Sequence, residues 1–145
     1  MKDDIKLSGR LEIHEIMEDG SRRLIREKCN LVVTVGKEWV AGAIIGATTY
    51  MNAIAVGSSS TPPQLSDIAL GAEIGRASAT SSASGTVITY TSTFAAGVGT
   101  GTWQEAGIFN SASANSGTML SHTTFSPVTK GSTQALSITW YVTVN

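Results

Sequence analysis

Few side chains of this chain could do chemistry, and their spacing matches no catalytic or metal-binding motif. His14 and His122 come without HxH, HExxH, CxxC or clustered-carboxylate spacing, so both are interpreted as surface or cross-strand polar contacts. The glycine-rich stretch 97–101 is followed by no helical period and no Gly-Lys-Ser/Thr, which excludes a phosphate-binding loop. No Gly-x-Ser-x-Gly elbow marks a nucleophilic serine. The sequence therefore predicts no enzyme activity, no cofactor and no metal.

One group of charged residues is a candidate site. Glu73 and Arg76 are separated by three positions, a spacing that pairs side chains on a helical turn. Glu105 lies among apolar residues, where an unpaired carboxylate costs several kcal/mol. Arg76 is the only Lys or Arg between positions 38 and 129, so we expect it to lie within salt-bridge distance of Glu73 or Glu105. The three are interpreted as a structural ion cluster, with a ligand-binding or catalytic carboxylate as the alternative.

Charge is distributed very unevenly along the chain. Sixteen of the 21 Asp, Glu, Lys and Arg residues lie before residue 39. The remainder is rich in Ser, Thr, Gly and Ala, and only 14% of all residues are charged, against about a quarter in an ordinary globular domain. A surface of hydroxyl and backbone groups suits a static protein that packs against copies of itself or a larger assembly.

Length and composition bound the class of protein. The 145 residues predict a single domain, 1–145, whose core is large enough to be stable without a disulfide or a structural metal. Cys29 has no partner for an internal disulfide and is interpreted as a half-buried strand residue. The net charge of −1 gives no electrostatic basis for binding nucleic acid or an anionic membrane. The N-terminus resembles no signal peptide, and the weakly charged helical stretch 39–45 is too short to span a bilayer.

The first 46 residues predict a charged hairpin and one helix. Alternating apolar residues over 7–16, a turn signal at Asp19-Gly20 and a second run over 22–35 predict an N-terminal hairpin at about 6–35. Helical spacing predicts a short helix near 37–45, ended by Gly46. A turn of helix is expected from Ser66 or Asp67 to Glu73.

The rest of the chain reads as strands. Runs at 51–56, 86–94, 102–109 and 119–125 have strand character, and 77–85 is interpreted as a loop or a poorly packed edge strand. Alternation is clearest in the last run, which predicts a core face made of Leu136, Ile138, Trp140, Val142 and Val144. About eight strands and one helix predict an all-β fold, an antiparallel β-sandwich of the jelly-roll-like kind.

A succession of short motifs resembles a known group of proteins. The motifs are Asn30–Lys37, Ile54–Gly57, Leu70–Arg76, Glu105–Phe109, Met119–Phe125 and Ile138–Val142. Their order resembles that in small virion structural proteins of tailed bacteriophages, including capsid cement or decoration proteins and domains of tail and fibre proteins. The resemblance covers most of the chain from Asn30 onward. It implies a β-sandwich, no enzymatic activity and assembly with other virion proteins.

These observations favour a capsid cement protein in the virion, assembled in the host cytoplasm. The expected partners are the major capsid protein and further copies of this chain, in a homo-dimer or homo-trimer. The charged hairpin is expected at the contact, so that deleting residues 1–28 weakens attachment while most of the sandwich stays folded. The alternative is a tail or fibre module that binds a host receptor or glycan by stacking sugar rings on Tyr90, Trp103 and Tyr141.

Overall fold

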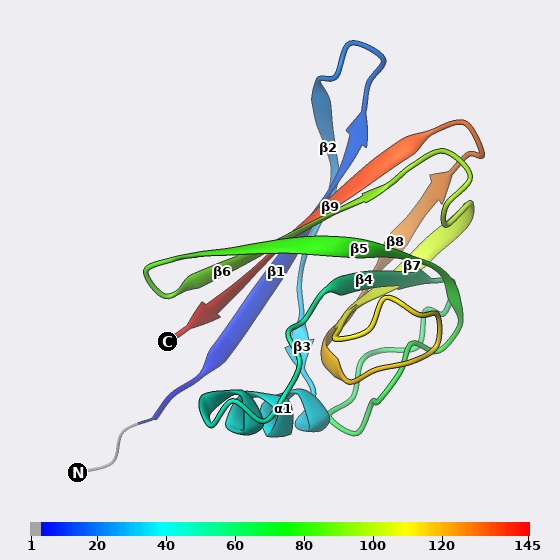
Figure 1. Cartoon of the computed structure of the whole chain (residues 1–145). Coiled ribbons are helices and arrows are strands. Elements are labelled where there is room, and N and C mark those ends of the chain that lie inside the picture. Colours follow the sequence, from blue (N-terminus) through cyan, green and yellow to red (C-terminus); the bar gives the residue numbers. More distant parts are fainter. Residues whose placement is uncertain (1–3) are drawn as a thin grey trace.

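A computed structural model describes residues 4–145 as one curved antiparallel sheet with a single helix (Figure 1). The strands are β1 (Leu7–Ile16), β2 (Arg22–Cys29), β3 (Leu31–Val32), β4 (Ala53–Gly57), β5 (Glu73–Ser84), β6 (Val87–Phe94), β7 (Gly101–Phe109), β8 (Met119–Lys130) and β9 (Ala135–Val144). The helix α1 spans Thr34–Ile44. The strand order is β2-β1-β9-β6-β5-β4-β7-β8-β3, with nine strands instead of about eight. The prediction of an all-β fold is confirmed.

The sheet is nearly closed and barrel-like, which corrects the expected jelly-roll-like sandwich. Its two edge strands, β2 and β3, are consecutive in the chain and are separated only by Asn30. The Asn30 backbone N–H donates to the Gly9 carbonyl of β1 at 3.0 Å, while β3 pairs with β8. Arg26 of β2 donates to the carbonyls of Ser126 and Pro127 in β8 at 3.1 and 2.9 Å. These contacts bring the two ends of the sheet together.

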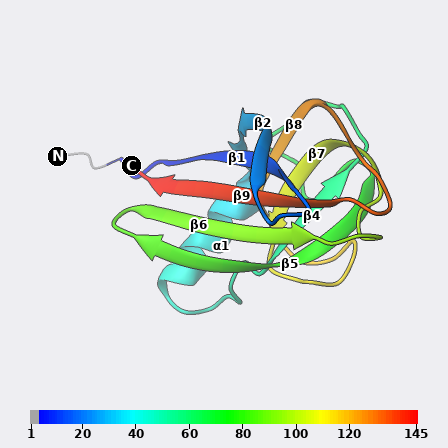
Figure 2. The same cartoon turned by 90° about the horizontal axis from the view of Figure 1, so that it is seen from above.

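The long strand β5 joins the two halves of the sheet, as Figure 2 shows from above. Its residues 73–78 pair with β4, and residues 79–84 pair with β6. The stretch 77–85 is therefore not a loop, and residues 79–84 pair on one side only, with β6, which agrees with the alternative of a poorly packed edge strand. Its exposed Ser and Ala residues produce the low-complexity composition that hides the strand in the sequence.

The N-terminal hairpin is an integral part of the sheet. β1 pairs over ten residues with β9, and Leu11 and Ile13 are fully buried. Deleting residues 1–28 would remove this strand, which has a neighbour on each side and supplies core residues, so the expectation that most of the fold survives the deletion does not fit the structure. The second predicted strand, 22–35, is also too long, because β2 ends at Cys29 and residues from Thr34 onward are helical. Cys29 itself is exposed rather than half-buried.

The helix α1 begins three residues before the predicted position. Gly36 permits its close approach to β8, since a Cβ at this position would collide with the Leu120 carbonyl. Gly46 ends the helix with φ of +70°, a conformation that favours glycine. The expected helical turn before Glu73 is absent. The Asp67 carboxylate instead accepts the Gln64 N–H at 2.8 Å within an irregular loop.

The core fills the inside of the barrel. Leu136, Ile138 and Trp140 are fully buried, Val142 is almost so, and Val144 is half-buried near the end of β9. Phe94 and Trp103 pack edge to face in the same core, with ring centroids 4.9 Å apart. The Trp140 indole N–H donates to the Asn30 side-chain oxygen at 2.7 Å, which holds the chain where it passes from β2 to β3.

Candidate functional site

The predicted ion cluster separates into two buried networks, and the first joins Arg76 to Glu73. The guanidinium Nε and Nη2 donate to the two Glu73 carboxylate oxygens at 2.8 and 3.0 Å. Both side chains are nearly buried, with exposed fractions of 3% and 6%. Residues three apart in a regular strand point to opposite faces. Here the pairing with β4 shifts register between Val56 and Gly57, so a bulge turns both side chains to one face.

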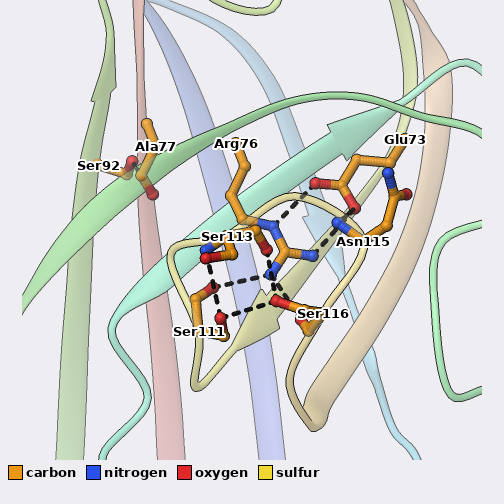
Figure 3. A network of polar contacts seen from close by, with 8 residues as sticks. All are labelled: Glu73, Arg76, Ala77, Ser92, Ser111, Ser113, Asn115 and Ser116. Carbon is orange, nitrogen blue, oxygen red and sulfur yellow. Dashed lines mark hydrogen bonds and ion pairs between the residues drawn. The ribbon is translucent and has the colours of Figure 1, made fainter.

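Arg76 also organises the loop between β7 and β8 (Figure 3). Its Nη1 donates to the carbonyls of Ser111 and Ser116 at 2.8 and 2.7 Å. The guanidinium carbon lies 4.1 Å from the centroid of the Phe109 ring, and the Asn115 N–H donates to Glu73 at 3.1 Å. With these partners the guanidinium presents no open face to a ligand, which supports the structural interpretation of the pair.

Figure 3 also shows the point at which β5 exchanges one neighbour for the other. Ser92 of β6 is buried, and its hydroxyl contacts the carbonyls of Ala77 and Ser78 at 3.3 and 3.1 Å. Register with β4 ends at Ser78 and register with β6 begins at Ala79. The hydroxyl therefore satisfies backbone acceptors at a discontinuity in the ladder.

Glu105 does not contact Arg76, and this corrects the expected three-residue cluster. The Glu105 side chain is fully buried and accepts the His122 Nε2–H at 2.9 Å. It also accepts the backbone N–H groups of Gly71 and Ala72 at 3.0 and 2.8 Å. Glu105 and His122 belong to the neighbouring strands β7 and β8. The residue directly opposite His122 is Gly107, which has no side chain, so the imidazole can reach diagonally to Glu105. The cation that pairs with Glu105 is a histidine from the adjacent strand.

His122 bridges two carboxylates. Its Nδ1–H donates to Asp67 at 2.7 Å, and the ring is only 4% exposed. Burial lowers the pKa of His122, but its hydrogen bonds to Glu105 and Asp67 outweigh burial and raise the pKa above the ordinary value of 6.5. Burial likewise raises the pKa of Glu105, yet the bonds from His122, Gly71 and Ala72 bring it below 4.5. The imidazolium and the carboxylate stabilise each other's charged forms.

Together these bonds hold the loop between β4 and β5 against the barrel. Loop residues Asp67, Gly71 and Ala72 all bond to Glu105 or to His122. Interpreting His122 as an ordinary polar contact missed this role. The available signal was scarcity, because His122 is the only histidine in a tract that holds just five Asp, Glu, Lys and Arg residues.

The buried polar groups of the two networks bond to other groups of the chain. Both ring nitrogens of His122 are occupied by carboxylates, and within residues 4–145 no group of three or more His, Cys, Asp or Glu residues could hold a metal ion. Lys130 of β8 is also buried, and its Nζ–H donates to the Ala95 carbonyl at 3.0 Å. What the arrangement does chemically is fix two loops.

The aromatic residues considered for glycan stacking do not form a binding surface. Trp103 is fully buried and Tyr90 is 4% exposed. Tyr141 is half-buried, and the Arg10 guanidinium covers its ring at 4.5 Å from the centroid. Stacking on a sugar requires free aromatic faces on one surface, and these three residues do not supply them.

Comparison with known proteins identifies no relative: no family model, no curated protein and no solved structure matches this chain. Among residues 4–145, no helix has the length and apolar character needed to cross a membrane. A function for the chain must therefore be argued from its own surface and contacts.

Proposed function

We propose that this protein is a structural virion protein of a tailed bacteriophage, a capsid cement protein that self-associates and binds the capsid shell. One observation carries the proposal. Sixteen of 21 Asp, Glu, Lys and Arg residues lie before residue 39, and most belong to the β1–β2 hairpin, whose turn stands at one extremity of the molecule (Figure 1). Ten charged side chains on this hairpin, beside a barrel that carries few, support oriented docking through the hairpin.

The hairpin carries charges of both signs in a fixed arrangement. Arg10 lies 3.0 Å from Glu12 and 3.2 Å from Glu27, and Arg23 pairs with Glu15. Arg22 and Lys28 are exposed on β2, which is an edge strand of the sheet. An edge strand offers backbone donors and acceptors to a strand of a partner, while side chains of mixed sign determine the register. We expect β2 to contact the capsid in this way.

The two internal networks support a static role. The loops between β4 and β5 and between β7 and β8 are each held by a buried ion pair. Such loops present one fixed surface to a neighbour, so little conformational entropy is lost on binding. Repetition of a modest contact over a shell lattice then produces high avidity.

Purified virions of the phage that encodes the chain provide the test. We expect the protein to co-purify with the particles at a fixed, high ratio to the major capsid protein, and to occupy lattice positions in electron microscopy. Presence in only a few copies on the tail would favour a tail or fibre module. Absence from the particles would overturn the proposal.

The role of the hairpin is tested separately by variants of equal charge change. Arg22→Gln with Lys28→Gln removes two positive charges from β2. When this variant is added to particles assembled without the protein, we expect it to occupy fewer sites than the wild-type chain. The control, Ser81→Glu with Ser84→Glu, changes net charge by the same amount on exposed positions of β5. Equal loss of binding by both variants would show that net charge, and not the hairpin, controls attachment.

A further inference from the structure

The second half of α1 is apolar on every side. From Trp39 to Gly46 the sequence contains no polar side chain apart from the indole N–H. The inward residues Trp39 and Val40 pack against the barrel core. On the outer side, Ile44 and Ile45 are each 79% exposed. Apolar side chains on every side of a helix are normally covered, so the second half of α1 has an uncovered apolar outer side, whereas Lys37 and Glu38 make the first half polar.

Neighbouring segments extend this apolar surface. Six of the ten large apolar side chains that are exposed within residues 4–145 lie on α1, at its end or in the segments that flank it, and we call them the α1 face: Ile5, Ile44, Ile45, Tyr50, Leu65 and Ile68. Hydrogen bonds tie the segments together, because the Trp39 indole donates to the Thr49 carbonyl and the Thr34 N–H donates to the Leu65 carbonyl. Tyr50, beside Thr49, is 87% exposed.

A hollow lies within the α1 face. A cavity of about 490 Å³ opens between α1 and the start of β1, and its lining includes Ile5, Val40 and Ile44, with Lys37 and Lys6. The exposed Ile45 side chain follows directly at the C-terminal cap of the helix. One face therefore carries both an apolar projection and an apolar hollow. A two-fold contact needs this combination, because each copy must offer both complementary parts.

We propose that the α1 face is covered by a second copy of this chain in a two-fold symmetric dimer. α1 packs against α1 of the partner subunit near Ala41, and Ile45 of each copy enters the hollow of the other. At roughly 100 Å² per side chain, six apolar residues bury about 600 Å² per copy and about 1,200 Å² in the pair, which lies in the range of specific interfaces. The net charge of −1 opposes the contact only weakly.

The proposal gives a surface to the self-association that the proposed function includes, and in that respect it rests on the proposed function. It also connects the two ends of the molecule. The turn of the β1–β2 hairpin and α1 lie at opposite extremities (Figure 1), so a dimer through α1 directs two hairpins away from each other. Such a dimer reaches two shell subunits at once.

The first test measures the dissociation of the purified full chain by analytical ultracentrifugation. We expect a dimer, and we expect Ile45→Lys to raise the dimer dissociation constant at least tenfold. The matched control is Leu24→Lys, since Leu24 is 49% exposed on β2, outside the α1 face; its dissociation constant should stay at the wild-type value. Circular dichroism verifies that both variants fold.

A wild-type chain that is monomeric at high concentration would overturn the proposal and leave the α1 face to a different virion protein. An Ile45→Lys dimer as tight as wild type would also overturn it. Neither result bears on whether the protein co-purifies with virions, so failure of this inference is distinguishable from failure of the cement function.

The second test detects the symmetry directly and does not depend on the Ile45 variant. Cys29 is exposed and is first replaced by Ser. In that background we introduce Ala41→Cys, which in the proposed dimer lies next to the same residue of the partner copy. A disulfide requires Cα atoms within about 7 Å, so mild oxidation should yield a covalent dimer. Ser82→Cys on exposed β5 is the control. Equal yields from both cysteines would indicate random collision and contradict the two-fold contact.

Discussion

At the scale of single residues, the few charges after residue 38 hold loops in place. Arg76 and Glu73 fasten the loop between β7 and β8, and Glu105 with His122 fastens the loop between β4 and β5. All four side chains are almost completely buried. A buried charge is tolerated only with a partner and satisfied hydrogen bonds, and each of these groups has both.

Removing the Arg76 cation tests the first network. Arg76→Met leaves the buried Glu73 carboxylate unpaired and frees two loop carbonyls, so we expect a loss of about 3–5 kcal/mol in the free energy of unfolding. Glu73→Gln combined with Arg76→Met should cost less than Arg76→Met alone, because no uncompensated charge remains. Urea denaturation measures both. Arg10→Met, at a side chain that is 43% exposed, is the control and should change stability by less than about 1 kcal/mol.

The second network predicts a dependence of stability on pH. The pKa of His122 is raised above 6.5, so its contribution is complete below pH 6.5 and is lost as the pH rises through the folded pKa. The pKa of Glu105 is lowered below 4.5, so its contribution is present above pH 4.5 and is lost as the pH falls through the folded pKa. We expect these two contributions together to be greatest between about pH 4.5 and 6.5.

His122→Gln checks the assignment. The variant should be less stable at pH 6 and should lose the decline in stability that His122 causes above pH 6.5, since neither Asp67 nor Glu105 then faces an imidazolium. His14→Gln removes the other histidine of the chain and serves as the control. If the His14 variant lost the alkaline decline and the His122 variant kept it, the assignment to His122 would be wrong.

At the scale of elements, two strands decide how the sheet is built. β5 pairs with β4 along its first half and with β6 along its second half, which makes one continuous sheet of two halves. β1 lies between β2 and β9 and carries fully buried Leu11 and Ile13. The charged hairpin is therefore both an exposed surface and a structural element.

This placement predicts how the hairpin responds to mutation. Leu11→Ala should reduce the free energy of unfolding by about 2–5 kcal/mol through loss of contacts and formation of a cavity. Leu24→Ala is the same substitution in the same hairpin at a side chain that is 49% exposed, so its effect should stay below about 1 kcal/mol. Deletion of residues 1–28 should abolish cooperative thermal unfolding. A truncated chain that still melts cooperatively near the wild-type temperature would contradict the structural role of β1.

At the scale of the whole molecule, two unlike surfaces lie at opposite ends. The end with the β1–β2 turn belongs to a charged hairpin, and the other end carries α1 with its exposed isoleucines (Figure 1). Between them lies a barrel whose exposed surface is rich in hydroxyl groups and poor in charge. This arrangement supports a subunit that contacts different neighbours with its two ends.

The proposed cement role predicts an effect on the particle. Virions assembled without the protein should lose their DNA at a lower temperature than complete virions, because the added contacts stabilise only the intact shell. Adding back the purified wild-type chain should restore the release temperature, followed by fluorescence of a DNA-binding dye. The Arg22→Gln, Lys28→Gln variant should restore it less well at equal concentration. Equal release temperatures with and without the wild-type protein would exclude a stabilising role.

The sequence by itself determined the local features. Alternation of apolar residues located the last strand and its inward face, and Gly46 marked the end of the helix. Side-chain period and turn residues are properties of neighbouring positions, so they can be read without knowing the fold. The pairing of Arg76 with Glu73 was predictable because Arg76 is the only Lys or Arg between positions 38 and 129. A bulge, and not a helical turn, brings the two side chains together.

Only the tertiary structure decided the features that join distant positions. The closure of the sheet depends on Asn30 directing the chain from β2 to β3, and the partner of Glu105 depends on the register of β7 with β8. A shift of one residue would turn His122 to the opposite face. Asp67 joins that site from a loop 55 positions away, and no local pattern encodes such a contact. Scarcity of charge indicated that Glu105 required a cation, but the cation itself was determined by strand pairing.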